Sequence, residues 1–241
     1  MQTLRMETLM KLVLTGKKYY DTVITIHSNK LGETNDCVDI SRRMGGARNF
    51  PKLTQKYEIE FLEVGSKEAY VLENVVASQR TSYTKDIDNF PISENYIKKM
   101  NRADWVHVCY IDDIEDPKQI LNLEAPYSVD FCKTHNRLKY LEILKKAKII
   151  FDSRERKDLY QETIVDTPII LHDPDGCEII VSGQKIYEDR CKRINNLNVN
   201  GAGDLFAKHF LDLFLFKKNV KKATSYALKQ TTHFLKNRNK Q

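Results

Sequence analysis

One segment, residues 198–216, constrains the fold and the function of this chain more than any other. It reads Asn-Val-Asn-Gly-Ala-Gly-Asp-Leu-Phe-Ala-Lys-His-Phe-Leu-Asp-Leu-Phe-Leu-Phe, and from Phe206 onward its apolar residues recur at the spacing of one helix face. The pattern predicts a helix that begins beside Gly201 and Gly203. At a helix N-terminus the unpaired backbone N–H groups and the positive end of the dipole favour an anion, and glycine lets a phosphate approach the backbone.

Asp204 directly follows these glycines and carries the wrong charge for an anion site. A carboxylate there would repel a phosphate, unless its task is to take the proton from a hydroxyl that attacks the phosphate. That is the arrangement a small-molecule kinase needs. A tight loop, in which Asp204 only complements the helix dipole, is the alternative. A dinucleotide-binding loop is disfavoured because the third glycine of its fingerprint is missing.

Composition limits the remaining classes of protein. The chain has 241 residues, 41% hydrophobic and 30% charged, which is typical of one soluble globular domain. Its five cysteines form no C-x-x-C pair. The chain also lacks the H-E-x-x-H motif of zinc hydrolases and the G-x-S-x-G motif of serine hydrolases, which argues against both classes. No run resembles a signal peptide or a membrane span. We therefore expect a reduced, cytoplasmic protein without a membrane partner, in which residues 1–9 are a loose extension.

The positive charge is concentrated at the C-terminus. The net charge is +6, and residues 217–241 hold eight Lys or Arg and no acid. Few aromatic residues lie between these charges, and Val220, Ala223, Ala227 and Leu228 form an apolar face. We therefore expect a helix with a solvated basic face and no nucleic-acid partner.

Apolar and β-branched runs predict the sheet. Residues 11–16 and 22–26 are interpreted as two strands joined by a turn, residues 57–64 and 69–76 as a hairpin, and residues 81–90 as a polar connection. Strands then alternate with helices: the predicted strands are 105–110, 128–132, 147–151, 167–171 and 177–181, and the predicted helices 94–101 and 137–146. This alternation predicts an α/β fold with a mostly parallel sheet covered on both faces.

Asn-Gly-Ala-Gly-Asp-x-Phe followed by an apolar helix resembles the C-terminal signature of the ribokinase-like (PfkB) carbohydrate kinases, and partial matches follow in the family's order along residues 11–235. The resemblance, to a short member, implies a ribokinase-like three-layer α/β/α fold with a mostly parallel central sheet and a small β lid. It implies a single kinase domain over residues 1–241, with lid strands from about 24–43 and 57–80. It also implies ATP-dependent phosphorylation of a sugar hydroxyl, with ATP and Mg²⁺ as cofactors, and leaves open a homodimer through the lid.

The resemblance assigns the catalytic residues. Asp204 is the expected base, Gly201, Ala202 and Gly203 form the expected anion hole, and Asn200, Gly201 and Gly203 are expected to bind the nucleotide.

A second family motif, Asn-x-x-Glu, has its counterpart in Asp152-Ser-Arg-Glu155, so Glu155 is the expected magnesium residue. Oxygen ligands at the carboxyl end of a parallel strand suit magnesium. A pair of helix-capping residues, Asp152 and Glu155, is the alternative.

The resemblance places the sugar site in the N-terminal half. Asp21 matches an aspartate that holds sugar hydroxyls, with an ordinary turn aspartate as the alternative. Gly45, Gly46 and Asn49 match the glycine pair and the asparagine of the sugar pocket, although Asn49 follows Gly46 by three residues where many members have four. Guanidinium groups match phosphate oxygens. Four arginines are therefore candidate partners for a phosphate on the substrate: Arg42, Arg43, Arg48 and Arg80. The alternative is that they are ordinary solvated surface residues.

Three positions depart from the family pattern. Asn198 and Val199 stand where Asp and Thr are usual, and His172 stands where Gly is common. Two rival functions therefore stay open: a nucleoside kinase of the same fold, and a member without catalysis that binds or regulates. The retained Asp204 and Glu155 argue against the second.

Overall fold

The structure is a computed structural model that describes residues 9–28, 30, 33–46, 57–77, 79–194 and 199–238. The predicted loose extension lies almost wholly outside these residues. The strands, in chain order, are β1 (Met10–Ile26), β2 (Asp39–Gly46), β3 (Tyr57–Asn74), β4 (Gln79–Asn89), β5 (Trp105–Val108), β6 (Tyr127–Asp130), β7 (Ile149–Ser153), β8 (Ile169–Asp173), β9 (Gly176–Val181) and β10 (Gln184–Arg190). The helices are α1 (Glu94–Met100), α2 (Leu141–Lys146), α3 (Ala202–Lys217) and α4 (Val220–Arg238), with the 3₁₀ segments η2 (Ile111–Asp113), η3 (Pro117–Asn122), η4 (Arg137–Tyr140) and η5 (Arg154–Tyr160).

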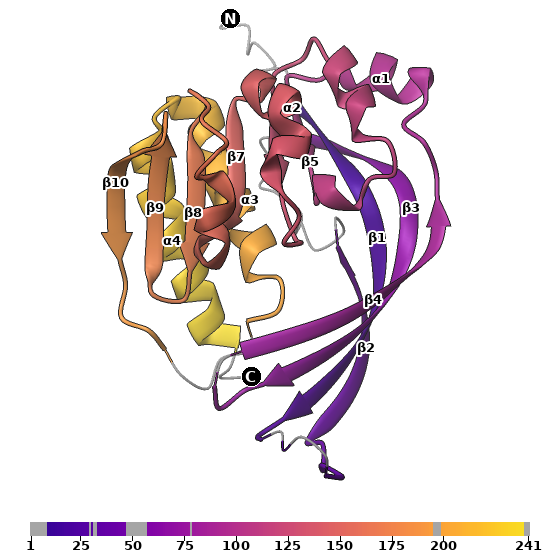
Figure 1. The fold of residues 1–241 in the computed structure, drawn as a ribbon, viewed down its shortest axis with the longest axis vertical. Helices are drawn as coiled ribbons and strands as arrows, with labels where there is room; N and C mark the ends of the chain where they lie inside the picture. The colour runs from indigo at the N-terminus through magenta and orange to yellow at the C-terminus, as the bar shows by residue number, and fades with distance from the viewer. Residues whose placement is uncertain are drawn as a thin grey trace, which may run out of the picture.

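A single sheet runs through the described part of the chain (Figure 1). Its order is β10-β9-β8-β7-β6-β5-β1-β3-β4, and β2 also pairs with β1. The strands from β3 through β1 and β5 to β8 are parallel. The pairs that involve β2, β4, β9 and β10 are antiparallel. The mostly parallel α/β sheet is therefore confirmed.

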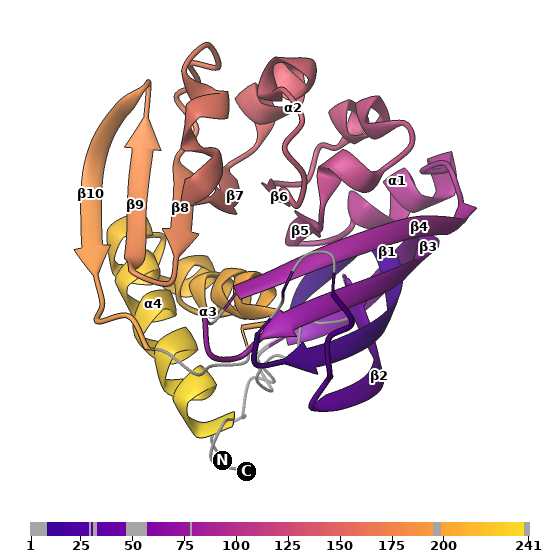
Figure 2. The same ribbon diagram turned by 60° about the horizontal axis from the view of Figure 1, so that its bottom comes forward.

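Helices cover both faces because the central strands are apolar on both sides. Phe151 and its neighbours on one face pack against Phe210 of α3 and Ala227 of α4. Ile150, on the opposite face, belongs to the core under α1 and α2, which includes Leu144. Figure 2 shows α3 and α4 on one side of the sheet and α1 and α2 on the other. These layers confirm the predicted α/β/α arrangement.

The two longest strands, β1 and β3, differ from the predicted elements. The turn predicted after Gly16 does not form, because β1 runs on with a change of register between Gly16 and Lys18. The hairpin predicted around Gly65 is likewise part of one strand, β3. Gly65 has φ +134°, and a Cβ there would lie 2.3 Å from the carbonyl oxygen of Asp88. Glycine marks a bend here instead of a turn, because it also lets a strand curve and a neighbouring backbone approach.

Beyond these bends, the strands leave the helix-covered sheet and form a curved extension, which we call the lid. The lid comprises residues 18–26 of β1, β2, residues 66–74 of β3, and β4, and Figure 1 shows it projecting from the body. Residues 81–90, interpreted as a connection, belong almost entirely to β4. Every residue of β4 is exposed, and such a polar edge strand lacks the alternation that identifies strands.

The C-terminal helix has the apolar face that the sequence predicts. Ala223, Ala227 and Leu228 of α4 are buried, and Val220 packs against the same core. In the part of the chain that is described, no helix has the length and apolar character required to cross a membrane.

A buried histidine lies at the centre of the sheet. Trp105 donates from Nε1 to the Oγ of Ser128 at 3.0 Å, and the Ser128 hydroxyl lies 2.9 Å from Nδ1 of His107. The Ser128 hydroxyl therefore links the Trp105 indole to the His107 ring. Burial lowers the pKa of His107 to about 3. Burial, together with the nearby charges of Arg156 and Arg154, lowers the pKa of His172 to about 4.

We expect the protein to lose stability as the pH falls below about 6.5, the ordinary pKa of an unfolded histidine. At pH values between about 6.5 and the lowered folded-state pKa values of His107 and His172, the unfolded chain binds more protons than the folded one. The contribution of these neutral histidines to the free energy of unfolding is therefore complete above pH ~6.5 and is lost on acidification. At pH ~5, His107 alone accounts for about 2 kcal/mol.

Urea unfolding at about pH 7.5 and pH 5 measures this loss. His107→Gln should show a smaller difference between the two pH values than the native protein. The control His27→Gln, at an exposed position, should behave as the native protein does. An unchanged difference in His107→Gln would reject the assignment.

Candidate active site

The first turn of α3 places Asp204 at the carboxyl edge of the parallel strands. Gly201 precedes the helix with φ +78°, a left-handed conformation that glycine readily adopts. The helix begins at Ala202, as predicted. Asp204 lies in its first turn and is 4% exposed, which is deep burial for a carboxylate.

Tyr110 holds the Asp204 carboxylate. Its hydroxyl donates a 2.6 Å hydrogen bond to Oδ1 of Asp204. Burial and the Asp204 charge raise the pKa of Tyr110 well above its ordinary value, so the phenol stays protonated. Tyr110 lies two residues after the end of β5 and has φ +54°, a left-handed conformation uncommon for a non-glycine residue. Tyr110 is not predictable as a site residue from the sequence, because no local pattern indicates this backbone geometry or the contact with Asp204.

A further buried carboxylate, Asp130, lies near Asp204. Burial, and then the charges of Asp204 and Asp152, raise the pKa of Asp130 well above its ordinary value. Asp130 accepts a 2.7 Å hydrogen bond from the Phe131 N–H. Buried carboxylates that repel one another favour a cation between them. Asp130 therefore fits as one of the one or two carboxylates with which proteins usually hold a magnesium–phosphate complex.

Asp152 has a structural role. Arg137, which is fully buried, donates to its Oδ2 from Nε and Nη2 at 3.0 and 2.7 Å. Arg156 donates to Oδ1 at 2.5 Å, and the Tyr160 hydroxyl to Oδ2 at 2.7 Å. Oδ1 of Asp152 also accepts a 2.7 Å hydrogen bond from the Ser153 N–H just before η5, so Asp152 contributes to the start of this segment as the helix-capping alternative expects. With its oxygens already shared among these donors, Asp152 is not a candidate magnesium ligand.

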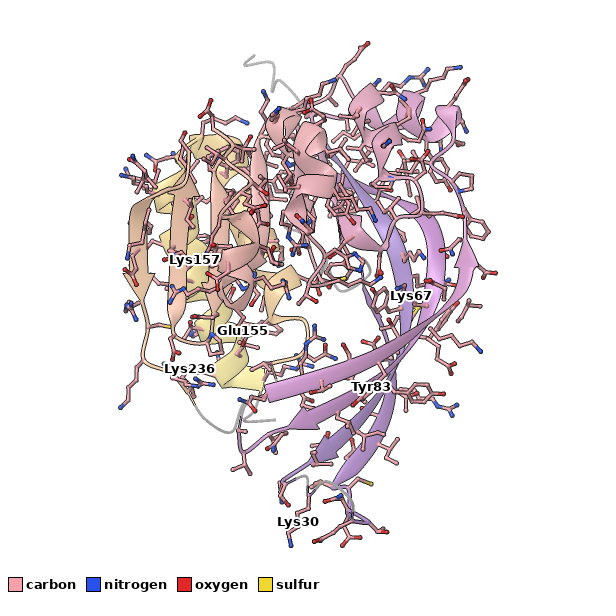
Figure 3. All side chains as sticks on the ribbon, in the orientation of Figure 1. Lys30, Lys67, Tyr83, Glu155, Lys157 and Lys236 are labelled. Carbon is pink, nitrogen blue, oxygen red and sulfur yellow. The ribbon has the colours of Figure 1, made fainter. Side chains whose placement is uncertain are left out.

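Glu155, the expected magnesium residue, is an exposed side chain at the start of η5 (Figure 3). The described residues include no cluster of three or more His, Cys, Asp or Glu side chains that could hold a metal ion. The magnesium role of Glu155 stays a prediction.

His172 lies against the N-terminus of α3. A Cβ added at Gly203 would lie 3.4 Å from Cε1 of His172, and the His172 ring stacks on Phe206 with centroids 4.9 Å apart. Nearby, Arg154 pairs with Asp173 at 3.3 Å, while its Nε and Nη2 are buried without a hydrogen-bond partner among the described residues. Arg154 therefore retains donors for an anion close to the helix N-terminus.

The lid, the loops after β5 and β6, and Asn200 just before α3 border a cavity of about 150 Å³, which we call the lid cavity. Its lining includes Asp21, Gly46 and Arg80 from the lid, and Tyr110 and Asn200 from the body. The structure thus brings two expected sugar-binding residues to the same cavity as the residue that holds Asp204.

Asp21 lies within β1, so its interpretation as a turn residue is wrong. It is 5% exposed, and burial raises its pKa, although the nearby charges of Arg43 and Arg80 act in the opposite direction. A Cβ at Gly45 would lie only 2.2 Å from Oδ2 of Asp21. Gly45 therefore makes room for the Asp21 carboxylate. Asn49 lies outside the described residues.

Asn200 joins the lid to the C-terminal helix. Its Oδ1 accepts a 2.8 Å hydrogen bond from Arg80, and its backbone carbonyl accepts a 3.0 Å bond from Arg238. The structure therefore places Asn200, expected in the nucleotide site, on the wall of the lid cavity. Among the candidate arginines, Arg43 and Arg80 lie near Asp21, and Arg48 lies outside the described residues, as does Asn198.

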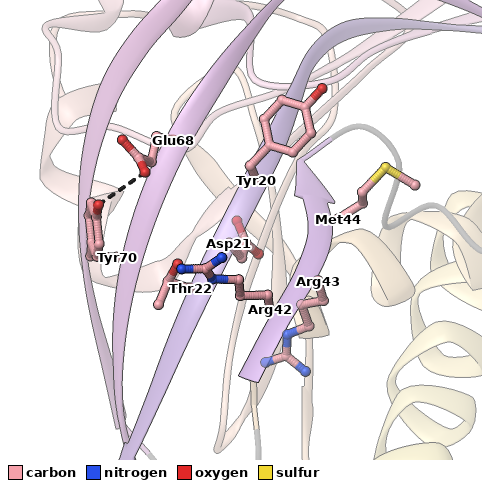
Figure 4. A pocket seen from close by; sticks show the side chains of 8 residues that line it. All are labelled: Tyr20, Asp21, Thr22, Arg42, Arg43, Met44, Glu68 and Tyr70. Carbon is pink, nitrogen blue, oxygen red and sulfur yellow. Dashed lines mark hydrogen bonds between the residues drawn. The ribbon is translucent and has the colours of Figure 1, made fainter. Parts of the chain in front are cut away.

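A second, open hollow of about 570 Å³ lies on the lid, lined mainly from the face opposite the lid cavity but also by Asp21 and Arg43 (Figure 4). The Tyr70 hydroxyl donates to Oε1 of Glu68 at 3.0 Å on this face. Side chains that alternate with those of the lid cavity contribute to its wall: Tyr20, Thr22, Arg42, Met44, Glu68 and Tyr70. A homodimer through the lid stays a prediction.

The three-layer body, the lid and the α3 terminus are the features by which this fold can be compared with those of solved structures. No family model and no curated protein matches the chain. Ribokinase from Arabidopsis thaliana, complexed with ribose and ATP, superimposes with a TM-score of 0.66 at 13% identity, over 95% of this chain and 93% of that one. A nucleoside kinase from Methanocaldococcus jannaschii gives 0.62 at 15% identity, over 95% and 92%.

A pyrophosphate-dependent kinase in the ribokinase family, complexed with a pyrophosphate analogue and myo-inositol, gives a TM-score of 0.62 at 15% identity, over 93% of this chain and 95% of that one. The chain therefore has the ribokinase-like fold along nearly its whole length.

Proposed function

We propose that the chain is a single kinase domain that transfers a phosphoryl group from ATP to a hydroxyl of a sugar or sugar derivative. One observation carries the proposal. Asp204, a buried carboxylate at the N-terminus of a helix, is held by Tyr110 beside a cavity that also contains Asp21. A base and an anion site at one helix end are the two parts that this chemistry needs.

Each residue has a role in the proposed reaction. Asp204 takes the proton of the attacking hydroxyl, and Tyr110 orients the carboxylate. Asp21 holds another hydroxyl of the substrate. The expected anion hole needs one revision, because the Ala202 N–H donates to the Val199 carbonyl at 3.0 Å. We therefore assign the stabilisation of phosphoryl charge mainly to the first-turn N–H of Gly203.

Magnesium and ATP belong to the same proposal. Asp130 would hold the cation, with Glu155 contributing from the edge, and magnesium would neutralise charge on the phosphates while the Asp204 carboxylate acts as the base. Arg154, with its unpaired donors, would pair with phosphate oxygens. A cytoplasmic location stays part of the proposal, supported by five free cysteines.

The rival without catalysis has one observation in its favour. The His172 ring covers part of the α3 N-terminus at Gly203, where the phosphates would approach. The other rival function, a nucleoside kinase, would use the same residues for phosphoryl transfer, with a nucleoside in place of a sugar in the lid cavity.

A screen separates these functions. Purified protein with ATP and magnesium is mixed with sugars, sugar phosphates and nucleosides, and thermal shift and ADP release are both recorded. The proposal predicts ADP release with at least one sugar or sugar derivative. Release with nucleosides alone would favour the nucleoside kinase. A thermal shift without ADP release for every compound would favour the binding protein.

The substrate should depend on Asp21. Asp21→Ala is expected to weaken substrate binding by roughly 1 to 3 kcal/mol, because a substrate hydroxyl or a pocket group loses its partner. Calorimetric titration and KM report this loss, while ATP binding stays unchanged. Thr22→Ala, at the next position of β1 on the opposite face of the lid, is the control. If Asp21→Ala loses ATP affinity and keeps substrate affinity, the two sites are assigned in reverse.

A further inference from the structure

Three lysines gather where the lid meets the body, and we call Lys17, Lys67 and Lys133 the lysine cluster (Lys67 is labelled in Figure 3). The ammonium groups of Lys67 and Lys133 both contact Oδ1 of Asp113, the former at 2.5 Å. Lys17 pairs with Asp86 at 2.7 Å, and Lys67 lies 3.5 Å from the same Oδ1 of Asp86. The cluster therefore joins two lid strands, β1 and β3, to the loops after β5 and β6.

The cluster carries more positive than negative charge. Within ion-pair distance, the described residues set three lysines against two carboxylates, those of Asp113 and Asp86. Asp113 is fully buried and also accepts from the Tyr19 hydroxyl, whereas Asp86 is 48% exposed. The side chains of Lys17 and Lys67 are each only 3% exposed. A buried group of charges is costly unless it is balanced.

The two lysines that share Asp113 are affected differently: burial lowers the pKa of Lys133, but the hydrogen bond and charge of Asp113 outweigh it and raise that pKa. Burial and the neighbouring charges of Lys133 and Lys17 lower the pKa of Lys67 to about 8, although Asp86 acts in the opposite direction. An anion beside Lys133 would balance the cluster.

The lysine cluster faces the candidate substrate site. Lys133, whose side chain is 34% exposed, lines the lid cavity together with Asp21, Arg80 and Tyr110. A ligand in this cavity therefore meets the Asp21 carboxylate, which suits hydroxyl groups, and two cationic side chains, which suit an anion. A purely structural bridge between lid and body would need neither the third lysine nor a place on the cavity wall.

We propose that the substrate carries an anionic group, a phosphate or a carboxylate, that binds Lys133 in the lid cavity. This inference rests on the proposed function, because it names the class of sugar derivative that is phosphorylated. Lys67 and Asp113 are positioning residues that fix the Lys133 ammonium. Arg80 faces the same cavity and would pair with the same group.

Matched pairs of ligands test the inference: ribose against ribose 5-phosphate, and glucose against gluconate. Each is titrated calorimetrically and assayed for ADP release with the native protein, Lys133→Met, Lys133→Arg and the control Lys145→Met. Lys145 forms an exposed ion pair with Glu142 in α2. Urea unfolding of each variant verifies that it is folded.

We expect at least one anionic compound to bind the native protein about tenfold or more tightly than its neutral partner. Lys133→Met should remove that preference and leave the affinity for the neutral partner within about twofold, while Lys133→Arg retains part of it and Lys145→Met all of it. The phosphate and carboxylate pairs show which anion is favoured.

Three results would overturn the inference: equal or tighter binding of both neutral partners, a preference that survives in Lys133→Met, or no binding of any of the four compounds. Turnover of neutral sugars without a preference for anions would reject the inference and leave the proposed function standing. Binding of an anionic compound that depends on Lys133, with no ADP release, would support the inference and reject the proposed function.

Discussion

Asp204→Asn leaves a folded protein that still binds nucleotide but whose turnover falls by on the order of 100-fold or more. Asparagine has nearly the same shape and can still accept the Tyr110 hydrogen bond, but it cannot take a proton from the substrate. The measurement is kcat by ADP release, with ATP affinity from calorimetry. Asp212→Asn, further along α3 and partly buried, is the matched control and should keep its activity.

Stability provides a second readout for the same variant. The Asp204 charge contributes to the raised pKa of Asp130, so removing it relieves repulsion between two buried carboxylates. We therefore expect the Tm of Asp204→Asn at neutral pH to equal or exceed that of the native protein. Unchanged turnover would reject Asp204 as the base, and a large fall in Tm would show that the carboxylate has a structural role.

Arg137→Met should destabilise the fold by about 3 to 5 kcal/mol. The buried guanidinium bonds Asp152 and the carbonyls of His135 and Lys133, and it lies over the Phe131 ring. Methionine fills part of the volume but leaves a buried carboxylate short of a partner. Urea unfolding near pH 7 gives the free energy of unfolding.

Two further variants complete the Arg137 test. Arg102→Met, at an exposed position after α1, should change stability by no more than about 0.5 kcal/mol. Adding Asp152→Asn to Arg137→Met should cost less than the sum of the single changes, because the uncompensated charge is removed. A loss below about 1 kcal/mol in Arg137→Met would contradict the account of this network.

The sequence predicts the body of the fold well, because its signals are local. The apolar spacing after Gly203 predicts α3, and the run that includes Phe151 predicts a buried strand, both from neighbouring residues alone. The charge of Asp204 beside the glycines likewise draws attention to the α3 terminus without any knowledge of tertiary contacts.

The lid and the walls of the site are less predictable, because they depend on distant contacts. Gly16 and Gly65 signal a change of direction, but whether the chain turns or bends depends on the strands that pair with it. Tyr110 reaches Asp204 across 94 positions of sequence, and Lys67 reaches Asp113 across 46. Such partners have no signature in the sequence around either residue.

The central claim is phosphoryl transfer, and identification of the product tests it most directly. Native protein, ATP, magnesium and the best compound from the screen are followed by ³¹P NMR, with Asp204→Asn in parallel. The account predicts ADP and a new phosphomonoester of the compound in equal amounts, formed by the native protein and almost absent with the variant. A compound that binds the lid cavity while ATP stays intact, or ADP that forms without a phosphomonoester, would contradict it.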